Sequence, residues 1–369
     1  MKVCHVTSGH SPFDGRIFHK ECQSLVRAGY KVTLIAPADF AEKQVDGIRI
    51  LGVPPATSRW QRLRVVQNII RRVRRLRPAL VHFHEPEILL FVPYFRPARV
   101  IYDCHEHYAH ALYRKFYLPK VIRYPLAWAF KVLEPALAQR VDAVVLVEDS
   151  QADTLWHNGR HTVFLYNYPR FNNQPLNRVS DGHTLIHTGN HAESKGCRIM
   201  IEAMRHVVLH ISEARLLLVG PFHNPAYEME MRHLISTYAL ERNIKLVGTV
   251  PHADVPNWIA QADIGLVPTM PQYQPSVPTK MFEYMMACLP ILASDLPVNR
   301  RFIQEAACGF LVNPDQPEAY AEKAVHLLRY PNEARALGER GYWAVRERFN
   351  WNQEEKKLLG LYEAILQGR

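Results

Sequence analysis

Short apolar runs alternate with longer helical stretches twice along this chain of 369 residues, and this repeated rhythm limits the fold more than any other feature. In the first half the apolar runs predict strands at residues 3–7, 31–37, 79–84, 99–105 and 141–148. Strands that alternate with helices favour a parallel sheet joined by crossover helices. Because the runs are almost continuously apolar, we expect helices to cover both faces of that sheet.

The same rhythm repeats in the second half of the chain. The apolar runs there predict strands at residues 183–189, 214–220, 244–250, 263–269, 289–295 and 309–313. Residues 167–182 are rich in Asn, Pro and Ser without periodicity, which is typical of a linker. We therefore expect two α/β domains, residues 1–168 and 169–349, and an amphipathic helix at about 350–369 that packs back on the first domain.

The two halves differ in charge. Residues 1–170 hold 25 Lys and Arg against 14 Asp and Glu, a net +11, and residues 171–369 hold 20 against 21, a net −1. A basic half indicates an anionic partner, which is nucleic acid, a membrane surface or an anionic substrate. Residues 59–77 carry eight arginines at amphipathic spacing, so they form either a core-packed helix with a solvated basic face or a helix that lies on anionic lipid. Residues 113–131 mix basic and aromatic side chains, which suits lipid headgroups or single-stranded nucleic acid.

The cysteines and the hydropathy of the sequence indicate the cellular compartment of the protein. The six cysteines lie far apart without ligand spacing, so we expect no disulfide framework. The start lacks the features of a signal peptide, and no apolar run approaches the length of about 18 residues that a membrane span needs. We expect a cytoplasmic protein that can lie peripherally at the inner face of the cell membrane.

Common nucleotide and metal motifs are absent from the sequence. It contains no Walker A motif, no G-x-G-x-x-G and no D-x-D pair, so we expect no cofactor and no metal. Alternating histidines mark the ends of two predicted strands, where they favour a binding cleft over a metal site. They are His82, His84, His105 and His107. Any nucleotide must then be held by helix N-termini and single side chains.

The stretch SVPTKMFEYMM offers such a helix start. Pro278 fits the first helical position and Ser276 fits a cap, and the N–H groups of Thr279 and Lys280 would then face an anion. Glu283 follows one turn later on the same face as the lysine. An ordinary amphipathic helix with a Lys–Glu surface pair is an equally good interpretation of this spacing.

A second basic candidate is Lys195. It follows the strand that ends in Gly189 and opens the next helix, at the strand-to-helix crossing where α/β folds bind ligands. The alternative is a solvated lysine at a helix start.

Six stretches together resemble the family-4 retaining glycosyltransferases. They are HSPFDGRIFHKECQSLVRAGYKVTLIAP, LVHFHEPE, VIYDCHE, TGNHAESKG, VGTVPHADVPNWIAQADIGLVP and SVPTKMFEYMMACLPILASD. The resemblance covers almost the whole chain and implies the GT-B architecture, in which two Rossmann-like, doubly wound domains face each other across a cleft. It also implies a nucleotide-sugar donor, UDP-linked in our interpretation, and a place in bacterial surface-polysaccharide synthesis.

The resemblance assigns roles residue by residue. Glu283 matches the second acid of an E-x7-E motif that binds ribose hydroxyls, and Lys195 matches the lysine that holds the donor diphosphate. His105 matches a histidine near the donor sugar, so His105 and Lys195 are the expected catalytic residues. The other expected donor-binding positions are Gly189, Asn190, Gly248, Val250, Ser276, Thr279 and Lys280.

The chain departs from the family pattern at three places. Pro275 stands where the first acid of the motif would be, and Asn190 stands where the family usually has arginine. We expect Lys280 to supply the missing positive charge. The glycine pair of the first loop is also missing, and we expect Asp14 and Arg16, which occupy that loop, to face the acceptor.

The expected activity is transfer of a sugar, with retained anomeric configuration, to a hydroxyl of a glycan or lipid-linked acceptor. An inverting or epimerising GT-B enzyme would share the fold and the donor site, and the configuration of the product would distinguish it. Outside enzymes, the alternative is a nucleic-acid-binding protein that uses the arginine-rich helix. The donor signature leads us to expect no nucleic-acid partner.

Overall fold

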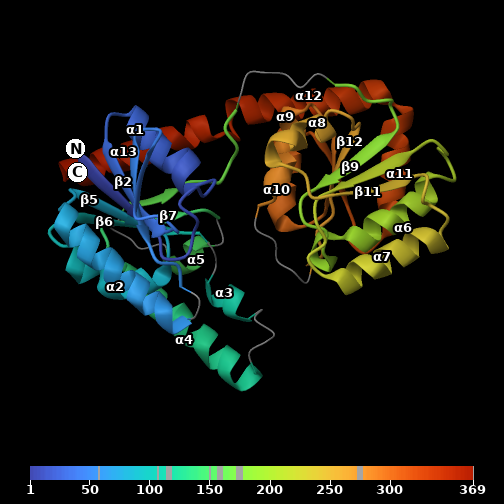
Figure 1. The fold of residues 1–369 in the computed structure, drawn as a ribbon. Coiled ribbons are helices and arrows are strands. Elements are labelled where there is room, and N and C mark those ends of the chain that lie inside the picture. The colour runs from blue at the N-terminus through green and yellow to red at the C-terminus, as the bar shows by residue number, and fades with distance from the viewer. Residues whose placement is uncertain are drawn as a thin grey trace. The chain divides into compact units, whose positions relative to one another are not determined.

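The computed structural model describes residues 1–56, 59–105, 108–113, 119–148, 151–155, 161–171, 178–271 and 277–368, and it divides into two compact units (Figure 1). The first unit combines Met1–Asn167 with Trp351–Arg369, and the second is Tyr168–Asn350. The division therefore lies one residue before the expected boundary at 168, and the C-terminal segment groups with the first unit.

The first unit is built on an eight-stranded sheet with the order β3-β4-β2-β1-β5-β6-β7-β8. Its strands are β1 (Lys2–Val6), β2 (Lys31–Pro37), β3 (Glu42–Val45), β4 (Ile48–Val53), β5 (Leu80–Phe83), β6 (Arg99–Cys104), β7 (Ala143–Leu146) and β8 (His161–Phe164). Neighbouring strands are parallel except β3 and β4. β1 lies between β2 and β5, where the chain order reverses, and open α/β sheets bind ligands at such switch points.

The antiparallel hairpin of β3 and β4 was not predicted from the sequence. Its turn is Asp46-Gly47, and both residues have positive φ, 49° and 79°. Asp-Gly is a strong hairpin signal because both residues accept this conformation. The strand β3 is polar and mostly exposed, so a search for apolar runs could not find it.

Helices cover both faces of the first sheet, as expected. The helical elements are η1 (Ile17–Cys22), α1 (Gln23–Arg27), α2 (Arg59–Leu76), η2 (Pro86–Phe95), α3 (Tyr108–Tyr113), α4 (Lys120–Ala138), α5 (Ala152–Leu155) and α13 (Trp351–Gln367). Residues of α2 and η2 form one core with the sheet, and residues of η1, α1 and α13 form another. Trp351 anchors α13, because its buried indole N–H donates to Ser24 Oγ at 2.9 Å.

The second unit contains a six-stranded parallel sheet with the order β11-β10-β9-β12-β13-β14. Its strands are β9 (Thr184–Thr188), β10 (Arg215–Val219), β11 (Ile244–Gly248), β12 (Ile264–Val267), β13 (Ile291–Ser294) and β14 (Gly309–Val312). The helical elements are η4 (Glu193–Lys195), α6 (Cys197–Val207), α7 (Pro225–Thr237), η5 (His252–Asp254), α8 (Val255–Ile259), α9 (Thr279–Met286), α10 (Pro297–Ala306), α11 (Pro317–Arg329) and α12 (Pro331–Glu347).

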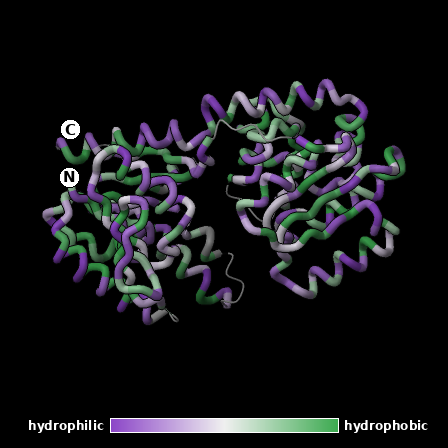
Figure 2. Tube along the Cα trace, turned by 45° about the horizontal axis from the view of Figure 1, so that its top comes forward, coloured by the Kyte–Doolittle hydropathy of each residue, from purple (hydrophilic) through white to green (hydrophobic). Residues whose placement is uncertain are grey.

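The strand order of the second unit is that of a Rossmann sheet, in which the first strand lies at the centre and the chain order reverses beside it. Here β9 is that strand, between β10 and β12. The expected α/β class with two Rossmann-like parts is confirmed. Figure 2 shows hydrophilic and hydrophobic residues alternating along many of the helices, as expected for helices that pack one face on a sheet. None of the described helices is both long and apolar enough to cross a membrane.

Candidate active site

The loop after β9 lies at the switch point of the second sheet and is shaped by glycines. Gly189, with a φ of 98°, donates its N–H to the carbonyl of Val219 at 2.8 Å. A Cβ on Gly220 would lie 2.1 Å from the Gly189 carbonyl oxygen, so the two backbones require glycine there. Gly220 in turn donates to the carbonyl of Gly248 at 2.8 Å. Of the expected donor-binding positions, Gly248 ends β11, and Val250 lies two residues further along and is partly buried.

Lys280, in the first turn of α9, lies against this loop. Its Nζ is 3.6 Å from where a Cβ of Gly189 would be and 2.6 Å from His187 Nε2. Burial, helped by the charge of Lys195 and opposed by Glu283, lowers the pKa of Lys280 to about 7. The amine therefore lies in a site that penalises its positive charge unless an anion is present.

Lys195 ends the helical turn η4 on the same loop and contributes to the lowered pKa of Lys280. Burial lowers the pKa of Lys195 as well. Gly196 follows with φ 63°, and a Cβ there would lie 2.6 Å from the carbonyl oxygen of Pro268, so this turn is packed tightly against the segment after β12. The structure thus brings the two expected phosphate-binding lysines together at one switch point.

The loop also contains buried polar atoms that have no hydrogen-bond partner in the described part of the chain. Asn190 Oδ1 and His191 Nε2 are buried without a hydrogen-bond partner among the described residues. His187 Nδ1 and His191 Nδ1 lie 3.2 Å apart, and burial followed by the charge of Lys280 lowers the pKa of both histidines. His187 and His191 were not among the predicted site residues, although both flank Gly189 in HTGNH.

The start of α9 differs by one residue from the expected one. Pro278 is the cap with an extended ψ of 107°, and Thr279 is the first helical residue. The fixed φ of proline suits both positions, so sequence could not distinguish them. Thr279 is exposed and Glu283, on the same helix, is partly buried. The expected donor contact Ser276 lies outside the described residues.

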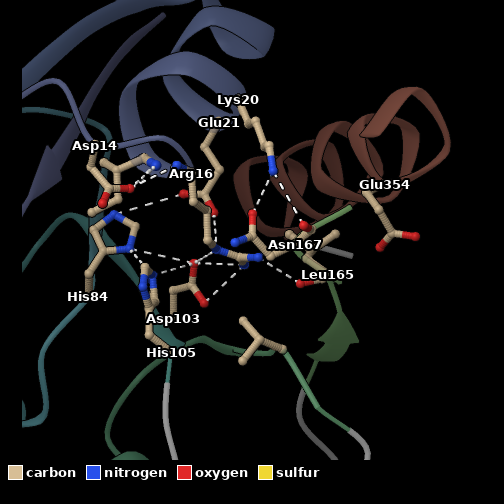
Figure 3. A network of polar contacts seen from close by, with 12 residues as sticks. Asp14, Arg16, Lys20, Glu21, His84, Asp103, His105, Leu165, Asn167 and Glu354 are labelled. Carbon is tan, nitrogen blue, oxygen red and sulfur yellow. Dashed lines mark hydrogen bonds and ion pairs between the residues drawn. The ribbon is translucent and has the colours of Figure 1, made fainter. Parts of the chain in front are cut away.

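His105 follows β6 in the first unit, and two buried side chains contact its Nε2 (Figure 3). His84 Nδ1 lies 3.0 Å away and Asp103 Oδ2 lies 3.3 Å away. Burial alone would raise the pKa of Asp103, but the charge of Arg16 and the nearby side chains of His105 and His84 hold it well below its usual range. Asp103 is therefore a buried carboxylate that faces His105.

The structure corrects the interpretation of Arg16 as an acceptor contact. Its side chain is only 4% exposed and points inward, where Nη2 donates to Asp103 Oδ2 at 3.0 Å and Nη1 donates to the Leu165 carbonyl at 2.8 Å (Figure 3). A buried acid needs a paired cation, and this requirement draws Arg16 into the core. Arg16 thus supports the residue that contacts His105.

Asp14 forms local bonds at the start of η1. Its Oδ1 accepts hydrogen bonds from the N–H groups of Arg16 and Ile17, and its Oδ2 lies 3.3 Å from His10 Nδ1. These bonds outweigh the effect of burial and hold the pKa of Asp14 below its usual range. The carboxylate remains one-quarter exposed, so contact with an acceptor stays a prediction.

One buried group among the described residues has the side-chain types of a metal site. Potential ligand atoms of Glu21, His82, His84 and Asp103 lie within 4.8 Å of one another. However, the Arg16 guanidinium lies in the same group, with Nε 2.8 Å from Glu21 Oε1. Burial and the charge of Asp103 raise the pKa of Glu21 well above its usual range, so a single carboxylate balances the guanidinium.

His82 and His84 do not face a cleft as the sequence suggested. Both are fully buried, because β5 is a central strand covered on both faces and their shared face packs against α13. The i, i+2 spacing correctly placed them on one face but could not say what covers it.

Two family models match the chain, one for each unit. The model described as Glycosyltransferase Family 4 matches residues 15–168, and the one described as Glycosyl transferases group 1 matches residues 182–330. Together they cover most of both expected domains. The chain belongs to the family-4, group 1 glycosyltransferases.

Individual relatives agree with this placement. The phosphatidyl-myo-inositol mannosyltransferase of Mycobacterium leprae is 27% identical over 50% of this chain and 47% of its own length. The chain thus aligns with about half the length of the curated relatives it matches. Anabaena HepE, solved in complex with UDP-glucose, has a TM-score of 0.74 at 15% identity and covers 99% of this chain and 100% of its own. WaaG, a glycosyltransferase involved in lipopolysaccharide biosynthesis, has a TM-score of 0.70 at 18% identity over the full length of both chains. The fold is therefore GT-B.

Proposed function

We propose that the chain is a retaining glycosyltransferase that moves a sugar from a UDP-linked donor to a hydroxyl of a glycan or lipid-linked acceptor. The observation that carries this proposal is the pair of lysines, Lys195 and Lys280, at the Rossmann switch point of the second unit. Each has a pKa lowered by burial, so the pair is suited to a bound diphosphate. The complex of HepE with UDP-glucose supports the choice of donor.

In the proposed reaction the protein acts mainly on the leaving group. The C1–O bond to the diphosphate breaks, its electron pair stays on the diphosphate, and the acceptor oxygen bonds to C1 on the same face. The hydroxyl proton passes to the departing diphosphate. Lys195 and Lys280 stabilise the charge that develops there, and His105 holds the donor sugar. No metal is needed in this scheme, because the lysines neutralise the diphosphate.

The surface of the first unit supports a membrane-bound acceptor. Helix α4 exposes apolar side chains, among them Val121 at 81% and Trp128 at 65%. The turn η2, which contacts both α4 and the arginine-rich α2, exposes Leu90 and Tyr94. Three further aromatic side chains of the 113–131 segment, those of Tyr113, Phe116 and Tyr117, lie outside the described part of the structure. We place the protein in the cytoplasm at the inner face of the membrane, where each nearby Lys or Arg contributes about 1 kcal/mol of attraction to anionic lipid.

The experiment that tests the activity is a screen of the purified chain against nucleotide sugars, with release of the free nucleotide and product NMR as readouts. A UDP-sugar as the preferred donor and a product with the donor's anomeric configuration would support the proposal. Inversion would favour the inverting alternative. Tight, salt-sensitive binding of nucleic acid without donor turnover would favour the nucleic-acid alternative.

Vesicle sedimentation tests the membrane part separately. Anionic vesicles should bind the protein, added salt should release it, and neutral vesicles should bind it less. The matched variant replaces four arginines of α2 with glutamine: Arg71, Arg72, Arg74 and Arg75. It should lose vesicle binding and keep donor binding, whereas equal binding to neutral and anionic vesicles would favour a water-soluble acceptor.

A further inference from the structure

Four histidines and one tyrosine form a continuous chain of side-chain contacts inside the first unit. His105 Nε2 lies 3.0 Å from His84 Nδ1, and His84 Nε2 lies 3.1 Å from His5 Nδ1. His5 Nε2 lies 2.9 Å from the hydroxyl of Tyr362, which lies 3.0 Å from His82 Nδ1. The chain thus runs from the edge of the β6 loop through β1 and β5 to the C-terminal helix α13.

The hydrogen bonds along this series of side chains must all run in the same direction. Burial lowers the pKa of His5, His82 and His84, so each of these rings is neutral and carries one proton. A neutral imidazole that donates from one nitrogen must accept at the other, and a hydroxyl can do both. Two arrangements result. In one, His105 donates and the last proton is on His82 Nε2; in the other, His82 donates from Nδ1 and His105 Nε2 accepts.

Asp103 distinguishes the two arrangements. Its Oδ2 lies 3.3 Å from His105 Nε2 and 3.9 Å from His82 Nε2. In the first arrangement both nitrogens carry protons, of which only that of His105 is within hydrogen-bond distance of the carboxylate, and His84 Nδ1 presents a lone pair to it from 3.5 Å. In the second both present lone pairs to it, and only His84 Nδ1–H, 3.5 Å away, faces it favourably. Arg16 holds the carboxylate in place at 3.0 Å, and the shorter distance from the carboxylate to His105 Nε2 than to His84 Nδ1 favours the first arrangement.

We propose that Asp103 and the His84–His5–Tyr362–His82 chain keep the proton of His105 on Nε2 and leave its Nδ1 as a hydrogen-bond acceptor for a sugar hydroxyl. This inference rests on the proposed function, because the resemblance places His105 near the donor sugar. Asp103 and Tyr362 are then positioning residues, and a tyrosine of the C-terminal helix influences the site through three rings. If the hydrogen bonds ran in the opposite direction, His105 Nδ1 would become a donor and the sugar would be misplaced.

Nitrogen-15 NMR of the histidine side chains in the ligand-free protein tests the tautomer directly. The His105 signals are identified by their loss in His105→Gln. We expect the wild-type protein to show Nε2 protonated and Nδ1 bare. Asp103→Asn should move the proton of His105 to Nδ1, since the amide can donate where the carboxylate accepted. Glu21 can ionise beside Arg16 in that variant and so keep the buried charge balanced.

A second variant tests the chain without changing charge. Tyr362→Phe removes only the hydroxyl that joins His5 to His82, so a population of His105 protonated on Nδ1 should appear. We expect kcat to fall by about tenfold with the donor KM little changed, because the sugar is bound but misplaced. The matched control is Tyr102→Phe, since Tyr102 is equally buried in the same unit but its hydroxyl bonds to Glu134 at 2.6 Å. The control should leave the tautomer and kcat unchanged.

Three results would overturn the inference. They are a wild-type His105 protonated on Nδ1, an unchanged tautomer in both variants, and a stoichiometric metal found in the purified protein by elemental analysis, which would occupy the histidine nitrogens. Because the NMR readout requires no turnover, it is independent of the donor screen. A failed screen with the expected tautomer would refute the proposed function alone, and an active transferase with the wrong tautomer would refute this inference alone.

Discussion

Binding of a nucleotide-sugar donor should draw a proton onto Lys280. In the ligand-free protein this amine has a pKa of about 7, while an ordinary lysine titrates near 10.4. At pH 8 only about a tenth of the molecules carry the proton, so binding that requires a charged lysine takes up about 0.9 proton. At pH 6 the lysine is already charged and the uptake falls to about 0.1 proton.

The sign of the pH dependence follows from the lowered pKa. Above pH 7 the protonated fraction of Lys280 falls by up to about tenfold for each unit of pH. The donor Kd should therefore rise by up to about tenfold per unit. Below pH 7 the Kd should be nearly flat. The other charged or titratable groups that face the amine are Lys195, Glu283, His187 and His191. Neither histidine competes for this proton, since both have pKa values lowered by burial.

Calorimetry in buffers of different ionisation enthalpy measures the uptake. The variant is Lys280→Met, which keeps the apolar stem and should abolish most of the uptake and the slope of Kd with pH. The control is Lys323→Met on the exposed face of α11, which should behave as wild type. Wild-type protein that binds donor at pH 8 without taking up a proton would refute the reasoning, and so would equal uptake in Lys280→Met.

The remaining predictions concern the other donor contacts. Glu283→Ala should raise the donor Kd by about tenfold or more, because a hydrogen bond to a charged group contributes about 1.5–3 kcal/mol. An unchanged Kd in calorimetry would contradict a role of Glu283 in binding the ribose. Lys195→Ala should lower kcat by about a hundredfold while the melting temperature stays near that of wild type, since its charge acts on the departing diphosphate. Unchanged turnover with a lowered melting temperature would instead show a structural lysine. Turnover should survive EDTA, and activity lost in EDTA and restored by manganese or magnesium would show that the lysines do not suffice.

The sequence predicted the strands well because most of them are buried parallel strands, whose apolar runs are easy to read. It missed β3 and β8, which lie at the edges of the first sheet, where apolar content is low, and it also missed β4, although that strand is apolar and buried. At the candidate site it identified Lys195 and Lys280 by their places after a strand and at a helix start. It could not show that Lys280 reaches His187, since this contact joins residues 93 apart in the chain.

Arg16 shows a different limit of the sequence. Its place in a loop predicted exposure, and only the three-dimensional structure shows a buried carboxylate within reach. The same holds for the chain that leads to Tyr362, which joins β1, β5 and α13 across most of the sequence. Pairings of this kind depend on which elements pack together, and a single sequence carries no direct record of that.

A comparison of the two switch points supports our proposal that the donor phosphates bind to the second unit. In the first unit the loop after β1 directs the N–H groups of Ser8 and Gly9 at the Glu85 carboxylate, 2.9 and 3.0 Å away. The chain thus places its own anion where a Rossmann fold would bind a phosphate. In the second unit the corresponding loop after β9 receives two lysines, Lys195 and Lys280, whose pKa values are lowered by burial, and for Lys280 also by the charge of Lys195. An anion that binds at the first site must displace Glu85, whereas one that binds at the second relieves a repulsion already present.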